Sequence, residues 1–234
     1  MSIKKIIKNI PIVGGWIVNL KRFAQYKLDR GFQGSKTYWE ERYAQGGNSG
    51  AGSYGRLANF KTQILTAFLQ ENNIGSVVEF GCGDGNQLSM IPYREYVGLD
   101  VSRSVILRCA ERFRADNSKS FFLFDPMAFC DRGGYFKHDM ALSLDVIYHI
   151  IEDDIFEKYM QHVFASARRF VVLYSTDYNS MQMKHVKHRE VTRWVNKNIP
   201  DWTLEKVIDN PFPYSESDPD NTSDAKFIFF SKKA

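Results

Sequence analysis

From residue 74 onwards, short apolar runs alternate with segments that have the length and apolar spacing of amphipathic helices. This alternation is typical of an open α/β sheet whose strands are connected by helices. The expected strands are residues 76–80, 96–99, 120–124, 140–144 and 170–174. The expected helices are residues 102–115, 155–167 and 189–197, with a short one at 87–90 and an earlier one at 57–71. We therefore predict a doubly wound α/β fold.

The end of the chain has a different pattern. Residues 202–208 and 226–230 are predicted strands, and the sequence between them, DNPFPYSESDPDNTSD, is rich in turn-forming residues and lacks helical spacing. Two strands joined by a loop favour an antiparallel pair that closes the sheet.

The length of the chain indicates how many domains it forms, and its cysteine content indicates the redox state of its compartment. A chain of 234 residues suits one domain with a short appendage. Its three cysteines, Cys82, Cys109 and Cys130, are odd in number and far apart, which fits a reducing compartment better than a disulfide framework. We expect a cytoplasmic protein.

Positive charge is concentrated in residues 1–30. The net charge of the chain is +4, and this segment contributes +6, so the other residues sum to −2 and do not form a basic domain that coats nucleic acid. An apolar run at residues 10–20 is too short to span a bilayer, and no small-residue cleavage site follows it. Two interpretations stay open: a helical arm that packs on its own domain or a partner, and a peripheral contact with the inner face of a membrane.

The sequence VVEFGCGDGNQ places Gly81, Gly83 and Gly85 directly after the first expected strand. Glycines at this point let backbone approach a ligand closely. Asn86 stands where the dinucleotide fingerprint has its third glycine, so the pyrophosphate-binding pattern is not met. The loop is acidic and contains no lysine or arginine, which favours a ligand without phosphates and suits a positively charged one.

Three later strands each end close to a carboxylate. Asp100 ends YVGLD and can accept hydrogen bonds from both hydroxyls of a ribose. Asp125, in FFLFDP, can accept from an adenine amino group, and Asp145, in LSLDVIYHI, precedes His149 by four residues. The pattern predicts a nucleoside site at the carboxyl edge of the sheet.

In their order and spacing, these four motifs resemble those of class I S-adenosylmethionine-dependent methyltransferases, and the resemblance covers residues 76–176. It implies a Rossmann-like seven-stranded sheet of order 3-2-1-4-5-7-6, with the last strand antiparallel, and S-adenosylmethionine as the cofactor. The contacts that it implies are Glu79, Gly81, Gly83 and Gly85 with the methionine half, Asp100 with the ribose, Asp125 or its neighbours Pro126 and Met127 with the adenine, and Asp145 with the amino group or sulfonium side. Val101 is a further implied cofactor contact.

The segment before the first strand, residues 31–73, resembles the helical cap that covers the cofactor in such enzymes. Its YWEERY sequence is aromatic, and Tyr38 and Tyr54 are candidate cofactor contacts because a cation is attracted to the face of an aromatic ring. The alternative is that these rings belong to the core. The expected organisation is an arm at 1–30, a cap at 31–73 and a methyltransferase domain at 74–234.

Transfer of a methyl group to a hydroxyl requires a base, and His149 is the first candidate. Its alternative is a buried structural histidine. A second basic segment contains Lys184, His185, His188 and Arg189. There we expect Lys184 and Arg189 to bind a phosphorylated or carboxylated acceptor, with His185 or His188 as an alternative base, although a solvated basic turn explains the same residues. The pattern is too weak for a metal site.

The wider pattern, including GNSGAGSYG and HVKHR, resembles a bacterial subgroup of small methyltransferases associated with polysaccharide pathways. That resemblance implies O-methylation of a sugar or another small hydroxylated acceptor in a cell-surface glycan pathway. Alternatives are a small-molecule nitrogen, a protein or a nucleic acid as the acceptor, and a non-catalytic subunit that binds the cofactor. We expect no nucleic-acid partner because no N/D-P-P-Y/F motif follows the fourth strand. A nicotinamide-dependent oxidoreductase is disfavoured by the missing third glycine.

Overall fold

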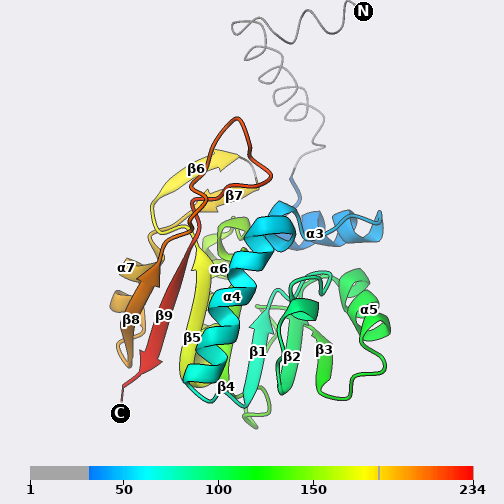
Figure 1. The fold of residues 1–234 in the computed structure, drawn as a ribbon, viewed down its shortest axis with the longest axis vertical. Coiled ribbons are helices and arrows are strands. Elements are labelled where there is room, and N and C mark those ends of the chain that lie inside the picture. Colours follow the sequence, from blue (N-terminus) through cyan, green and yellow to red (C-terminus); the bar gives the residue numbers. More distant parts are fainter. Residues whose placement is uncertain (1–31, 184, 234) are drawn as a thin grey trace, which may run out of the picture. The chain divides into compact units, whose positions relative to one another are not determined.

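A computed structural model of the chain describes residues 32–183 and 185–233. The main sheet has seven strands in the order β3-β2-β1-β4-β5-β9-β8 (Figure 1). Its strands are β1 (Ser76–Phe80), β2 (Glu95–Asp100), β3 (Lys119–Leu123), β4 (His138–Leu144), β5 (Ala167–Ser175), β8 (Trp202–Ile208) and β9 (Lys226–Lys232). The α-helices are α3 (Ser35–Ala44), α4 (Gly55–Glu71), α5 (Arg103–Arg112), α6 (Asp153–Ala165) and α7 (Val191–Asn198).

The predicted sheet topology is confirmed. Strands β1 to β5 pair in parallel, and β9 is antiparallel both to β5 and to β8. Because β8 and β9 are the sixth and seventh strands of this sheet along the chain, the observed order equals 3-2-1-4-5-7-6. The antiparallel pair at the end of the sheet is therefore the one that the turn-rich tail predicted.

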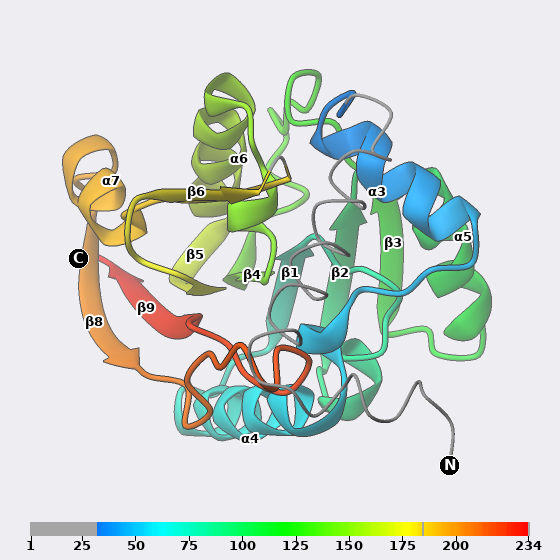
Figure 2. The ribbon, with the colours of Figure 1, turned by 90° about the horizontal axis from the view of Figure 1, so that it is seen from above.

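Helices cover both faces of the sheet, with α4 on one face and α6 and α7 on the other (Figure 2). On the first face, Leu65 and Phe68 of α4 belong to one apolar cluster with Phe229 of β9. On the second face, Val163 of α6 packs in a cluster with Val195 of α7. Full burial of an aliphatic or aromatic side chain stabilises a fold by about 1.5–3 kcal/mol. These two clusters therefore hold the helices against the two faces of the sheet.

A second sheet was not predicted. Strands β6 (Ser180–Met183) and β7 (Val186–His188) form an antiparallel hairpin in the segment where we predicted either an anion-binding patch or a solvated basic turn. These strands are short, and their sequence is poor in the β-branched and aromatic residues that signal a strand. The hairpin follows β5, and its turn lies close to helix α3, as the site below shows (Figure 1).

The predicted basic arm, residues 1–30, lies outside the described residues. Within residues 32–183 and 185–233, no helix is long and apolar enough to cross a membrane.

Candidate active site

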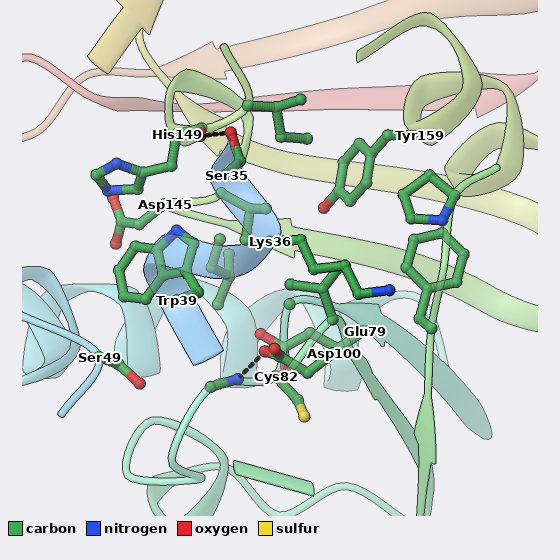
Figure 3. A pocket seen from close by; sticks show the side chains of 18 of the residues that line it. Ser35, Lys36, Trp39, Ser49, Glu79, Cys82, Asp100, Asp145, His149 and Tyr159 are labelled. Carbon is green, nitrogen blue, oxygen red and sulfur yellow. Dashed lines mark hydrogen bonds between the residues drawn. The ribbon is translucent and has the colours of Figure 1, made fainter. Parts of the chain in front are cut away.

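A cavity lies at the carboxyl ends of the strands, beneath helix α3 (Figure 3). Its walls include the glycine loop after β1, the ends of β2 and β4, the residues that follow β3, and side chains of α3 and α4. The predicted cofactor residues that line it are Glu79, Gly81, Gly83, Asp100, Val101, Asp125 and Asp145, and the predicted base His149 lines it as well. The topology therefore brings together residues that are far apart in the sequence.

The glycine loop has a conformation that side chains would obstruct. Gly81 has a φ of +83° and Gly83 a φ of +56°, which L-residues with a Cβ rarely adopt. A Cβ atom on Gly83 would lie 2.3 Å from Oγ of Ser49, and one on Gly81 would lie 2.3 Å from Cγ2 of Val146. These two glycines let the loop pass close to neighbouring chain segments at the edge of the cavity. Gly85 instead faces Phe113 and does not line the cavity.

Two buried carboxylates lie next to this loop. Asp100 accepts hydrogen bonds from the backbone N–H of Gly83, at 3.1 Å, and of Ser102, at 2.9 Å. Burial raises the pKa of Asp100 to about 6 and that of Glu79 to about 7, although the hydroxyl of Tyr96 donates to Glu79 at 2.6 Å. Both carboxyl groups retain lone pairs for donors from a ligand.

Asp125 lies at the rim of the cavity, in an ion pair with α3. Nζ of Lys36 is 2.9 Å from Oδ2 of Asp125, and both side chains are exposed to solvent. The hydrogen bonds from Lys36 and from the backbone N–H of Met127 hold the pKa of Asp125 below its ordinary value. This pair joins the cap to the segment that follows β3.

Asp145 is bound to a buried lysine that the sequence analysis did not select. Nζ of Lys61, in α4, lies 2.5 Å from Oδ2 of Asp145, and the hydroxyl of Tyr148 donates to Oδ1 at 2.7 Å. The Lys61 side chain is only 1% exposed. Asp145 has a left-handed φ of +58°, which is uncommon outside glycine. The available signal was a lysine on the apolar stripe of the helix, four residues after Leu57 and four before Leu65.

His149 lies half-buried between the cap and the β6–β7 hairpin. Its ring meets Trp39 of α3 edge to face, with centroids 5.0 Å apart. Nδ1 lies 3.3 Å from the backbone carbonyl oxygen of His185. Burial lowers the pKa of His149 to about 4, so its imidazole is neutral near pH 7.

The aromatic residues of the cap take different positions. Trp39 and Tyr43 line the cavity. Tyr38 stacks on the His185 ring, with centroids 5.0 Å apart. The hydroxyl of Tyr54 donates to Asp84 at 2.8 Å. Trp39 and Tyr43 are thus the two cavity rings that we did not predict, because spacing alone does not distinguish them from Tyr38 and Tyr54.

The basic residues after β5 lie apart from the cavity. His188 and Arg189 line a separate groove, which is bordered by α6, α7 and the hairpin. Lys187 and Arg189 both pair with Asp153, at 2.6 and 2.8 Å, and Arg189 also donates to the carbonyl oxygen of Ile150. The positive charge of the predicted anion patch is therefore partly compensated within the chain. Lys184 lies outside the described residues.

His188 is held in place rather than exposed to the cavity. Its Nδ1 lies 2.7 Å from the hydroxyl oxygen of Thr176, and its ring packs near Tyr148 and Tyr178. Within the described ranges, 32–183 and 185–233, no group of three or more His, Cys, Asp or Glu side chains could hold a metal ion.

The strand order and the position of the cavity define the class I methyltransferase fold, a Rossmann-like sheet closed by an antiparallel pair. The sequence matches no protein-family model and no curated protein. Solved structures with this fold include the N-methyltransferase NodS from Bradyrhizobium japonicum in complex with S-adenosyl-L-homocysteine. It is 15% identical, with a TM-score of 0.68 over 86% of this chain and 100% of that one.

Two further structures have the same fold. Magnesium protoporphyrin IX methyltransferase (ChlM) from Synechocystis with bound S-adenosylmethionine is 14% identical, with a TM-score of 0.61 over 88% of this chain and 100% of that one. The methyltransferase domain of bacterial CtHen1-C is 20% identical, with a TM-score of 0.57 over 74% of this chain and 97% of that one. At these identities the likeness establishes the fold.

Proposed function

We propose that this chain is an S-adenosylmethionine-dependent methyltransferase. The observation that carries the proposal is the cavity itself, in which a lysine-free glycine loop and the carboxylates Asp100, Asp125 and Asp145 meet at the carboxyl edge of the sheet. Structures that share the fold were crystallised with S-adenosylmethionine or S-adenosyl-L-homocysteine, which supports the same ligand here.

The residues of the cavity fit this cofactor. Asp100 keeps free lone pairs beside the loop, where they can accept hydrogen bonds from ribose hydroxyls, and Gly81 and Gly83 line the cavity there. Asp125 would take the adenine end, and Val101 would lie beside it. When bound, the cofactor supplies a methyl group that is activated by a sulfonium centre.

His149 is our proposed base for a hydroxyl acceptor. A backbone carbonyl can only accept a hydrogen bond, so the contact with His185 places the proton of the neutral ring on Nδ1. Nε2 then carries the free lone pair and can take the proton from the acceptor hydroxyl as that oxygen attacks the methyl group. Burial lowers the pKa of His149 to about 4, and the negative charge of Asp145 opposes a part of this shift.

The surroundings of His149 support a small acceptor with an uncharged reacting end. Trp39, Leu144 and Ile150 line the cavity near it, and the flat face of an indole suits the C–H face of a sugar ring. We therefore propose O-methylation of a sugar or another small hydroxylated acceptor, in a cell-surface glycan pathway. A peripheral membrane contact through residues 1–30 is part of the same proposal.

The test combines an acceptor search with one substitution. The chain is incubated with methyl-labelled S-adenosylmethionine and fractionated cell extract, and products that gain the label are identified by mass spectrometry. His149→Ala should abolish labelling while binding of S-adenosyl-L-homocysteine stays intact, and His138→Ala, at the far end of β4, is the matched control. Labelling at the wild-type rate in His149→Ala would show that His149 is not the base. Cofactor binding without any labelled product would favour the non-catalytic subunit.

A further inference from the structure

One end of the cavity contains a buried amide with an unused acceptor. Gln87 follows the glycine loop, lines the cavity and is 7% exposed. Its Nε2 donates to the carbonyl oxygen of Ala58, at 3.1 Å, and to the hydroxyl of Thr62, at 2.9 Å. Because a carbonyl oxygen only accepts, the orientation of the amide is fixed. Its Oε1 has no hydrogen-bond partner among the described residues. Buried polar atoms are nearly always paired, so this oxygen points to a donor that a ligand would bring.

A buried ammonium with spare donors, that of Lys61, lines the same cavity. Lys61 has three N–H groups, and the described residues give it one hydrogen bond, to Asp145, together with a contact of 5.1 Å to the centre of the Tyr174 ring. Its side chain is 1% exposed, so bulk water does not satisfy the other donors. A ligand with an anionic oxygen would.

Gln87 and Lys61 belong to one place in the fold. The amide of Gln87 is bound to Ala58 and Thr62, which flank Lys61 on the same turns of α4. Both side chains line the cavity. The chain therefore presents an unpaired acceptor and a positively charged donor, both buried, to the same cavity.

Asp145 is already engaged in this arrangement. One of its oxygens accepts from Lys61 and the other from Tyr148. The Tyr148 hydroxyl stays protonated because burial raises its pKa well above the ordinary value. With its charge matched by Lys61, Asp145 is better placed to orient that lysine than to receive a second cation.

We propose that Gln87 and Lys61 recognise the zwitterionic amino-acid head of the cofactor, with Gln87 accepting from the ammonium and Lys61 donating to the carboxylate. Asp145 is a positioning residue that acts through Lys61. The inference rests on the proposed cofactor and goes further, because it assigns selection of the whole cofactor over its nucleoside part to two residues outside the glycine loop.

The test compares two ligands that differ in this head. S-adenosyl-L-homocysteine carries the amino-acid group, and 5′-methylthioadenosine lacks it but keeps the adenosine and the sulfur. Calorimetric titration of the full chain should show that Gln87→Met and Lys61→Met each lose about 10- to 100-fold in affinity for S-adenosyl-L-homocysteine, because hydrogen bonds to charged groups are lost. Affinity for 5′-methylthioadenosine should stay within about twofold of wild type, since no contact with that ligand is removed.

Two further variants keep the test decisive. Lys61→Met leaves Asp145 buried and uncompensated, so the double variant Lys61→Met/Asp145→Asn provides a folded reference if the single one unfolds. Lys36→Met, the same substitution at the rim, should change the affinities for both ligands by the same factor. Equal losses for both ligands in Gln87→Met and in the Lys61 variants, or no loss for either, would overturn this inference alone. A wild-type chain that binds neither ligand would overturn the proposed function with it.

Discussion

Nδ1 of His149 lies 3.3 Å from the carbonyl oxygen of His185, which is 36 residues further along the chain. The contact joins the turn after β4 to the tip of the β6–β7 hairpin. His149 cannot move from its place beside Trp39 without breaking this hydrogen bond, and the bond selects the tautomer of the ring. The unpredicted hairpin thus orients the only histidine that lines the cavity among residues 32–183 and 185–233.

The depressed pKa of His149 predicts a loss of stability in acid. The group titrates at about 4 in the folded chain and near 6.5 when unfolded, so between these values the unfolded state binds more protons. The stability that neutral His149 contributes is full above pH 6.5 and is lost as the pH falls towards 4. At pH 5 the loss relative to pH 8 is about 2 kcal/mol.

Glu79 and Asp100 also have shifted pKa values in this range. The contribution of His149 is therefore measured as the difference in unfolding free energy between the wild type and a variant that lacks the ring. Urea denaturation of the wild type and of His149→Gln at pH 5 and pH 8 isolates the contribution of the ring. The wild type should lose about 2 kcal/mol more than the variant. An identical pH dependence in both proteins would mean that His149 is accessible to protons in the folded state.

Glu79 predicts the opposite trend. Burial raises its pKa from 4.5 to about 7, so the folded chain binds the extra proton and ionisation at higher pH costs stability. The protonated Glu79 side chain costs no stability below pH 4.5. The folded chain then loses stability as the pH rises through 7, because the buried carboxyl group ionises. Glu79→Gln keeps an acceptor for the Tyr96 hydroxyl, and we expect it to be about 3 kcal/mol more stable than wild type at pH 8 and nearly equal to it at pH 4.5. Chemical denaturation at the two pH values measures this, and a variant less stable at pH 8 would contradict it.

The sheet could be predicted from the sequence because its central strands β1, β4 and β5 are largely buried on both faces. Phe80 and Val172 belong to continuous apolar runs, and such runs mark a strand without knowledge of its neighbours. Carboxylates at strand ends were also predictable, since parallel strands deliver their carboxyl ends to one edge. Asp100 and Asp145 reach the cavity for that reason.

The contacts within the site could not be predicted in this way. That Lys61 pairs with Asp145 depends on how α4 is rotated over the sheet, and a lysine in an apolar stripe carries no information on its partner. The unpaired oxygen of Gln87 follows from the two acceptors that its Nε2 meets on α4. The hairpin was missed because its strands contain three and four residues, too few for alternation to be recognised.

Gly83 predicts a steric requirement in the loop. Gly83→Ala adds a Cβ that would lie 2.3 Å from Oγ of Ser49, in a backbone with φ of +56°. Strain and clash together should cost about 1–3 kcal/mol in the free energy of unfolding and displace the loop, which weakens cofactor binding. Gly46→Ala is the matched control, because its φ is +83° and no atom lies within 4 Å of the added Cβ. Thermal denaturation of both variants separates clash from strain, and equal losses would exclude the contact with Ser49.

Asp100 should dominate binding of the nucleoside half of the cofactor. Its carboxylate is fixed by the N–H groups of Gly83 and Ser102, so its remaining lone pairs are already oriented when the ligand arrives. Asp100→Ala removes these acceptors and also releases the loop, and we expect the affinity for S-adenosylmethionine to fall by about 100-fold. Because the loss affects contacts with the ribose, the affinity for 5′-methylthioadenosine should fall by the same factor, in contrast to the variants of Gln87 and Lys61.

Calorimetry with both ligands checks this prediction, with Asp220→Ala in the exposed loop between β8 and β9 as the control. Unchanged affinity in Asp100→Ala would show that the cofactor does not use the carboxyl edge of β2, and the assignment of S-adenosylmethionine to this cavity would fail.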